Sequence, residues 1–192
     1  MKLGLLETAK YGFSVHLRTV EQDLKEKKAQ TVGLARLQKW CGLRDRTERE
    51  AAQKMREVIQ KMPEPPSSST AAAWQADWMA SLLDEGYLDD ARCAESYTRV
   101  HLEHKKWGPL KIKAGLAARG VSGTVSSAAI QAVPESDWQS AADVLLRRRL
   151  HELEDHQDRV VRWLMQRGFP QWMVWTALDG LSSDAAQPNQ DS

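Results

Sequence analysis

Between positions 86 and 121 the chain alternates short amphipathic stretches with residues that begin or end helices. Gly86 predicts a helix end, because glycine adopts the left-handed backbone conformation without a steric penalty, and Asp89 or Asp90 can cap the next helix. A further helix is expected from Pro109, which suits a first helical turn, to Gly120. The inward faces of these two helices are expected to carry Cys93, Ala94, Tyr97, Val100, His101, Leu110, Ile112 and Leu116.

The same apolar spacing predicts helices along the rest of the chain from residue 32. They are expected as two helices within 32–59, one from residue 71 to Gly86, one each over 121–133 and 137–150, and two between 160 and 178. Leu83, Ala128 and Met165 are among the residues expected to face inward. A stretch rich in proline and serine at 62–70 predicts a loop inside the first helical module, with a boundary between independent domains as the alternative.

The two ends of the chain carry weaker patterns. In residues 1–31 a partial alternation around Gly12 indicates extended structure, whereas the charged segment 19–29 fits a surface helix. The polar residues 181–192 are expected to form a disordered tail.

Two segments of the chain match one another at a constant offset. Arg119-Gly120 corresponds to Arg167-Gly168, 48 positions later, and the apolar residues around both turns match at the same offset. A fixed offset with matched helix ends indicates tandem copies of one supersecondary unit. We therefore predict an all-α fold of three-helix, helix-turn-helix-like repeats, stacked into an elongated curved array. The repeats are expected over 32–88, 89–133 and 134–180, after an N-terminal extension at 1–31.

The central stretch carries the sequence GYLDD-x-R-x-A, then a basic turn, GP, K-I-x-x-x-L and R-G-V. This order and spacing resembles the RecX family of RecA regulators, most closely over 71–133 and more weakly over 32–178. Two residues depart from the family pattern: Cys93 stands where phenylalanine is usual, and Ala51 where leucine is usual. The resemblance implies a non-enzymatic inhibitor that binds RecA, or the RecA filament on single-stranded DNA, and suppresses recombinase and ATPase activity.

The composition fits a soluble globular protein. Of the 192 residues, 42% are hydrophobic and 28% are charged, and the net charge is +1, so any nucleic-acid affinity must come from local patches. The two cysteines are expected to be buried free thiols, and no apolar run suits a signal peptide or a membrane span, which favours a cytoplasmic location without membrane contact. Eight tryptophans are many for this length, and Trp74, Trp78 and Trp107 are candidate contact residues.

Catalytic chemistry is not indicated. We find no catalytic motif, and His101 with His104 supplies too few ligands for a recognisable metal site, so we expect no enzyme activity, metal, cofactor or small-molecule substrate. Basic residues are the remaining functional signal, since rows of cations can follow phosphates or pair with acidic side chains. The candidate contact residues for RecA or DNA are Arg92, Lys105, Lys106, Lys111, Lys113, Arg119, Arg147, Arg148, Arg149, Arg162 and Arg167.

Two alternatives stay open. Helix pairs joined by glycine turns resemble the helix-turn-helix motif, which would make the protein a DNA-binding regulator that reads sequence through residues 124–131. That segment lacks Arg, Lys and Asn, the side chains that best read base edges. The other alternative is a helical interaction module with a different partner. Weak direct DNA binding is compatible with RecA regulation as well.

Overall fold

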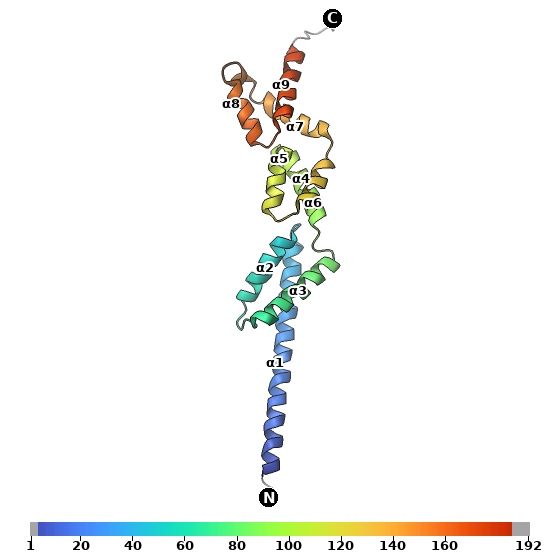
Figure 1. Cartoon of the computed structure of the whole chain (residues 1–192), viewed down its shortest axis with the longest axis vertical. Helices are drawn as coiled ribbons and strands as arrows, with labels where there is room; N and C mark the ends of the chain where they lie inside the picture. Colours follow the sequence, from blue (N-terminus) through green and yellow to red (C-terminus); the bar gives the residue numbers. More distant parts are fainter. Residues whose placement is uncertain (1–3, 186–192) are drawn as a thin grey trace. The chain divides into compact units, whose positions relative to one another are not determined.

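The computed structural model describes the backbone of residues 4–185 and the side chains of residues 20–181 (Figure 1). Within that part of the chain all regular secondary structure is helical, as the sequence predicts. The elements are α1 (Gly4–Cys41), α2 (Glu48–Gln60), α3 (Ser68–Asp84), α4 (Asp90–Lys105), α5 (Pro109–Ala118), α6 (Gly123–Gln131), α7 (Glu135–Arg147), the short 3₁₀ helix η1 (Leu150–Glu152), α8 (Leu153–Gln166) and α9 (Gln171–Ala185). None of the described helices combines the length and the apolarity that crossing a membrane requires.

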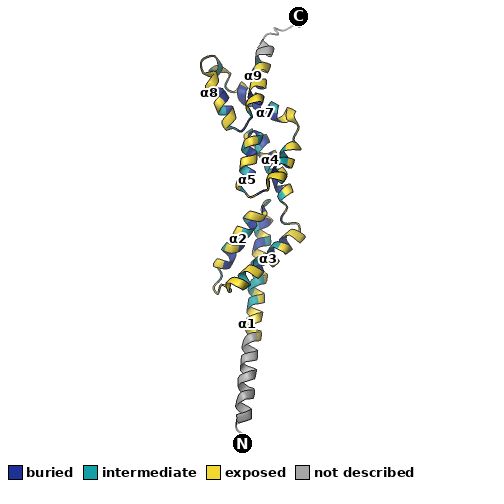
Figure 2. Ribbon diagram, in the orientation of Figure 1, coloured by how far each residue is buried: buried dark blue, intermediate teal, exposed yellow. Residues whose placement is uncertain are grey.

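The chain divides into two compact units. Unit 1 comprises Met1–Arg44 and Glu50–Leu88, and unit 2 comprises Asp45–Arg49 and Asp89–Ser192. Each unit has its own cluster of buried apolar side chains. Figure 2 shows buried residues in both units. In chain order the helices form the three-helix sets α1–α3, α4–α6 and α7–α9, and the last two sets share one core.

Unit 1 is built around Trp78, whose side chain is 1% exposed. The ring lies against Gly33 of α1, where an added Cβ would meet the ring carbons. The indole Nε1 donates a hydrogen bond to the Gln30 carbonyl at 3.1 Å. The expectation that Trp78 is a contact residue is therefore wrong. Trp74 is also mostly buried but lines a groove of unit 1 described below, so its contact role stays a prediction.

The extended structure expected around Gly12 is wrong, because α1 runs unbroken from Gly4 to Cys41. The partial alternation of apolar residues gave the wrong prediction, because Phe13, Leu17 and Val20 are also spaced by four and three residues, which fits a helix equally well. The loop after α2 is shorter than expected. It ends where the Ser67 hydroxyl accepts a hydrogen bond from the Thr70 amide at 3.2 Å and caps α3.

The helix ends predicted in the central stretch are confirmed. Gly86 and Gly120 have positive φ angles of 72° and 87°. The Asp89 carboxylate accepts a hydrogen bond from the Arg92 amide at 2.9 Å and caps α4, and Pro109 is the first residue of α5. Each of these features depends on a few adjacent residues, which is why the sequence predicts them.

Several side chains expected to face inward are exposed instead. Val100 is 39% exposed and Leu110 is 56% exposed. The buried row of α4 includes Ala94, Thr98 and Leu102, spaced by four residues, and an apolar pattern misses the polar Thr98. The other exposed members are Leu83, Ala128 and Met165.

The C-terminal end of the described chain is more ordered than expected. The prediction of a disordered tail is wrong over residues 181–185, because α9 continues to Ala185. Residues 186–192, the rest of the predicted tail, lie outside the described residues.

The two Arg-Gly turns that mark the internal repeat make similar contacts inside unit 2. The Arg119 carbonyl accepts a hydrogen bond from the hydroxyl of Thr47, in the Asp45–Arg49 segment, at 2.8 Å. The Arg167 carbonyl accepts one from the Gly108 amide at 2.8 Å, and the Gly168 carbonyl accepts another from the Leu110 amide at 3.0 Å. The second pair of bonds ties the start of α5 to the turn after α8.

Candidate functional site

Side chains near the ends of three helices surround an open hollow of about 680 Å³ in unit 2, here called the basic hollow. Its lining consists of Glu103, His104, Lys105, Lys106, Trp107, Leu145, Arg148, Arg149, Glu152, Trp163 and Arg167. The five basic side chains outnumber the two carboxylates, so the hollow favours an anionic partner.

The cations reach this position because three helices end beside it. The residue that follows each helix is basic: Lys106 after α4, Arg148 after α7 and Arg167 after α8. Cations are favoured at these positions, because the unpaired carbonyls of a helix C-terminus carry partial negative charge. The hydrogen bond from Gly108 to the Arg167 carbonyl then joins the first and third of these helix ends.

Two tryptophans hold most of these cations in place. Lys105 Nζ and Lys111 Nζ each lie 4.8 Å from the ring centroid of Trp107. The Cζ atoms of Arg149 and Arg167 lie 4.2 Å and 5.1 Å from the ring centroid of Trp163. Each cation–π contact contributes about 0.5–1 kcal/mol at an exposed site. The rings therefore restrict long side chains that would otherwise lose rotamer freedom on binding.

Polar contacts add to this ordering. Both Glu152 carboxylate oxygens accept hydrogen bonds from Arg149 Nη1 at 3.0 Å. Arg167 Nη1 donates to the Lys105 carbonyl at 3.2 Å, and Lys111 Nζ lies 3.5 Å from the Gln166 carbonyl. These contacts hold Lys111, Arg149 and Arg167 beside the hollow.

The structure brings together only some of the predicted contact residues. The basic hollow contains Lys105, Lys106, Arg148, Arg149 and Arg167, and Lys111 adjoins it through Trp107. The predicted residues outside its lining are Arg92, which pairs with Asp45 at 3.3 Å, Arg119, whose Cζ lies 5.2 Å from the Tyr97 ring centroid, and the exposed Lys113, Arg147 and Arg162.

Sequence reasoning missed Trp163, which holds two of the arginines of the hollow. One signal was available: Trp163 and Arg167 stand four residues apart, at the end of α8, a spacing that brings two side chains together. Trp107, which the sequence did single out, lies in the hollow. The contact between Trp163 and Arg149 joins two separate elements, so no spacing of neighbouring residues in the sequence could predict it.

Beside the hollow, His101 stacks on Tyr97 with ring centroids 3.7 Å apart and lies 4.6 Å from the Trp107 centroid. Partial burial lowers the pKa of His101, and the nearby charges of Lys105 and Arg119 act in the same direction. The Tyr97 carbonyl, 2.8 Å from Nδ1, opposes this shift. Burial also raises the pKa of the Tyr97 hydroxyl. No group of three or more potential metal-ligating His, Cys, Asp or Glu side chains occurs among the described residues.

Lowering the pH from about 7.5 to about 5.5 is expected to reduce the free energy of unfolding, partly through His101. The folded protein favours the neutral imidazole, whereas the unfolded chain binds a proton near pH 6.5, the ordinary pKa. The stabilising contribution is therefore present above that pH and is lost as the pH falls through the lowered pKa. The urea midpoint should fall less in His101→Gln than in the parent protein, and equal falls would contradict this role.

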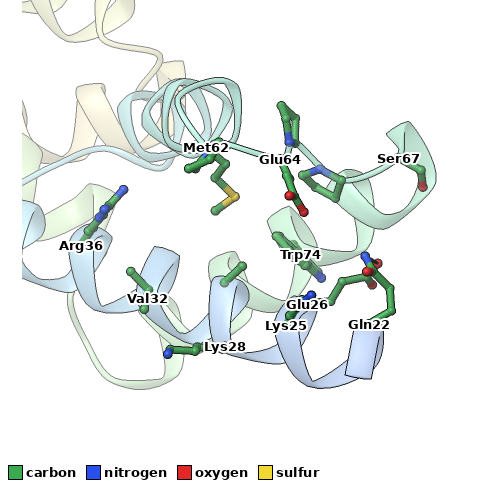
Figure 3. A pocket seen from close by; sticks show the side chains of 14 residues that line it. Gln22, Lys25, Glu26, Lys28, Val32, Arg36, Met62, Glu64, Ser67 and Trp74 are labelled. Carbon is green, nitrogen blue, oxygen red and sulfur yellow. Dashed lines mark hydrogen bonds between the residues drawn. The ribbon is translucent and has the colours of Figure 1, made fainter. Parts of the chain in front are cut away.

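A second groove, of about 490 Å³, lies in unit 1 between α1 and the loop that precedes α3 (Figure 3). Val32, Met62 and Trp74 supply apolar surface, and Lys25 and Lys28 of α1 are among its charged residues. Its lining has three basic and two acidic side chains, so this groove selects a partner by charge less strongly than the basic hollow does.

Comparison with known proteins supports one family. A family model described as RecX, second three-helix domain, matches residues 89–130. The Regulatory protein RecX of Xanthomonas citri is 33% identical over 116 residues, which cover 60% of this chain and 66% of that protein. That of Thermus thermophilus is 40% identical over 85 residues, covering 44% and 54%. That of Lacticaseibacillus paracasei is 30% identical over 105 residues, covering 52% and 44%, so the matches span about half of these two relatives' lengths.

A solved structure extends the comparison to the fold. The crystal structure of RecX from Lactobacillus salivarius has a TM-score of 0.70 at 18% identity and covers 81% of this chain and 98% of that chain. The sets α4–α6 and α7–α9 carry matched Arg-Gly turns, and together with the set α1–α3 they define an all-α tandem-repeat protein. By the family model and the relative from Xanthomonas citri, the chain belongs to the RecX family, a family of regulatory proteins.

Proposed function

We propose that this protein binds RecA, or the filament of RecA on single-stranded DNA, and lowers its ATPase and strand-exchange activities. Membership of a regulatory family supports the proposal, since the matching relatives carry the name Regulatory protein RecX. The observation that carries it is the basic hollow, where Trp107 and Trp163 hold Lys105, Arg149 and Arg167, three of its five cations, around an open surface.

The hollow suits a partner with carboxylates or phosphates. Three of its five cations are already ordered by the two rings, so binding costs less side-chain entropy than it would for freely rotating lysines and arginines. The rings of Trp107 and Trp163 are already covered by cations of the protein itself, so they are less available to stack on a nucleic-acid base. This favours a partner that binds by charge pairing. We therefore assign the hollow to acidic side chains or backbone phosphates of the filament.

Co-sedimentation with RecA filaments assembled on single-stranded DNA tests binding, and the DNA-dependent ATPase assay tests inhibition. We expect the protein to pellet with the filament and to reduce ATP hydrolysis at micromolar concentration. A protein that stays in the supernatant and leaves the ATPase rate unchanged would reject the proposal.

The same assays with DNA alone separate the DNA-binding alternative. Residues 124–131 of α6 offer Thr, Ser and Gln as their polar side chains, which gives little capacity for reading bases. We expect weak binding to DNA alone that falls steeply with added salt and shows no sequence preference. A thousandfold preference for one duplex sequence would instead favour a sequence-reading regulator.

A further inference from the structure

The part of α1 that precedes its packing on α3 presents apolar side chains to solvent. Val20 is 43% exposed and Leu24 is 63% exposed. Packing inside unit 1 begins further along the helix. The Gln30 carbonyl accepts a hydrogen bond from Trp78 Nε1 at 3.1 Å, and Gln30 Nε2 donates one to the Asp77 carboxylate at 3.0 Å. Gly33 then lies against the Trp78 ring. A helix without tertiary contacts is only marginally stable in water, so this part of α1 is expected to be stabilised by packing against a partner.

The sequence places these residues in a heptad repeat. Leu17, Val20 and Leu24 follow one another at spacings of three and four, and the same register continues to Phe13 and Leu6. Written as heptads, Leu17 and Leu24 occupy a positions, whereas Leu6, Phe13 and Val20 occupy d positions. This is the pattern of a narrow seam between two helices. Its apolar residues end at Leu24, because the next d position is Lys27, shortly before α1 begins to pack on α3 at Gln30.

We propose that α1 pairs with α1 of a second copy of this chain as a parallel two-stranded coiled coil, whose apolar seam runs over residues 6–24 and whose flanking charge pairs extend to Lys28. Charge supports this occupant. In a parallel pair the g position of one helix faces the following e position of its partner, five residues on. Asp23 then faces Lys28 of the partner chain, and both side chains are exposed in unit 1. By the same rule the sequence pairs position 16, a histidine, with position 21, a glutamate, and none of the g–e pairs joins like charges.

Lysine at one a position fits two strands. Lys10 takes the a position between Leu6 and Phe13. A single polar residue at such a position fixes register and oligomer state at some cost in stability, because larger bundles bury it more completely. Pairing through α1 involves unit 1 and requires neither RecA nor the basic hollow.

Sedimentation equilibrium on the full chain tests the proposal in the absence of RecA and DNA. We expect twice the monomer mass at tens of micromolar, with reversible dissociation on dilution. Leu24→Glu should weaken association by about 100-fold or more, because each dimer loses two apolar side chains from its seam. Gln22→Glu adds the same charge at the outward f position and should leave the mass unchanged.

Charge exchange gives a test that does not depend on the apolar variant folding. Asp23→Lys places lysine against Lys28 of the partner chain and should weaken association about fivefold to tenfold. Adding Lys28→Asp restores an opposite-charge pair and should return the dissociation constant to within about twofold of the parent. Failure of the double variant to recover would overturn the parallel register.

Cysteine cross-linking fixes the orientation. Cys41 and Cys93 are buried, so a cysteine at position 20 or 24 is the accessible thiol among the described residues. Both Val20→Cys and Leu24→Cys should form intermolecular disulfides, since a parallel pair brings each position beside its own copy. A monomeric or tetrameric mass for the parent protein, or cross-linking at only one of the two positions, would overturn the proposal.

Discussion

Replacing Gly108 by alanine is expected to lower the free energy of unfolding by about 3 kcal/mol. An added Cβ would meet the carbonyl carbon and oxygen of Gly168 and the amide nitrogen of Phe169. These are backbone atoms and cannot rotate aside, so the turn after α8 would have to move away. The bonds from Gly108 to Arg167 and from Leu110 to Gly168, now 2.8 and 3.0 Å, would then be strained or lost.

Gly123→Ala is the matched control, because a Cβ at the first residue of α6 meets nothing within 4 Å. It should change the free energy of unfolding by no more than about 0.5 kcal/mol. Urea unfolding followed by circular dichroism measures both variants. Equal midpoints for the two alanine variants would mean that the contact between Gly108 and Gly168 contributes nothing to unit 2.

Reversing two charges of the basic hollow is expected to weaken inhibition of the RecA ATPase by roughly 30-fold, equivalent to about 2 kcal/mol. In Lys105→Glu/Arg148→Glu, attraction to an acidic or phosphate surface becomes repulsion at two adjoining helix ends. Both side chains are exposed, so the variant should fold with nearly the parent's stability. The half-inhibitory concentration in the ATPase assay is the measurement.

Lys39→Glu/Arg56→Glu changes the net charge by the same amount on exposed residues of unit 1. Lys39 lies in the last turn of α1, as Lys105 does in α4. Replacing either lysine by glutamate therefore carries the same unfavourable interaction with the helix dipole. This control should retain inhibition within about threefold of the parent. If both variants lose inhibition equally, net charge and not the hollow provides the affinity.

The internal repeat shows how far a pattern of adjacent residues can be followed into function. The offset between Arg119-Gly120 and Arg167-Gly168 predicted tandem units, and in unit 2 each Arg-Gly turn accepts a hydrogen bond from a preceding segment. The same pattern did not predict which cations assemble. Arg92 and Arg119 looked equivalent to Lys105 in sequence, yet of these three Lys105 alone lines the hollow.

The sequence by itself determined the helix ends, the all-α class and the family, because capping, glycine turns and apolar spacing depend on residues within about one helical turn. Tertiary structure decided the rest. It left Leu110 exposed and buried Trp78 against Gly33. It also brought Lys105, Arg148 and Arg167 together from three helix ends, since contacts between residues far apart in the chain depend on how the helices pack.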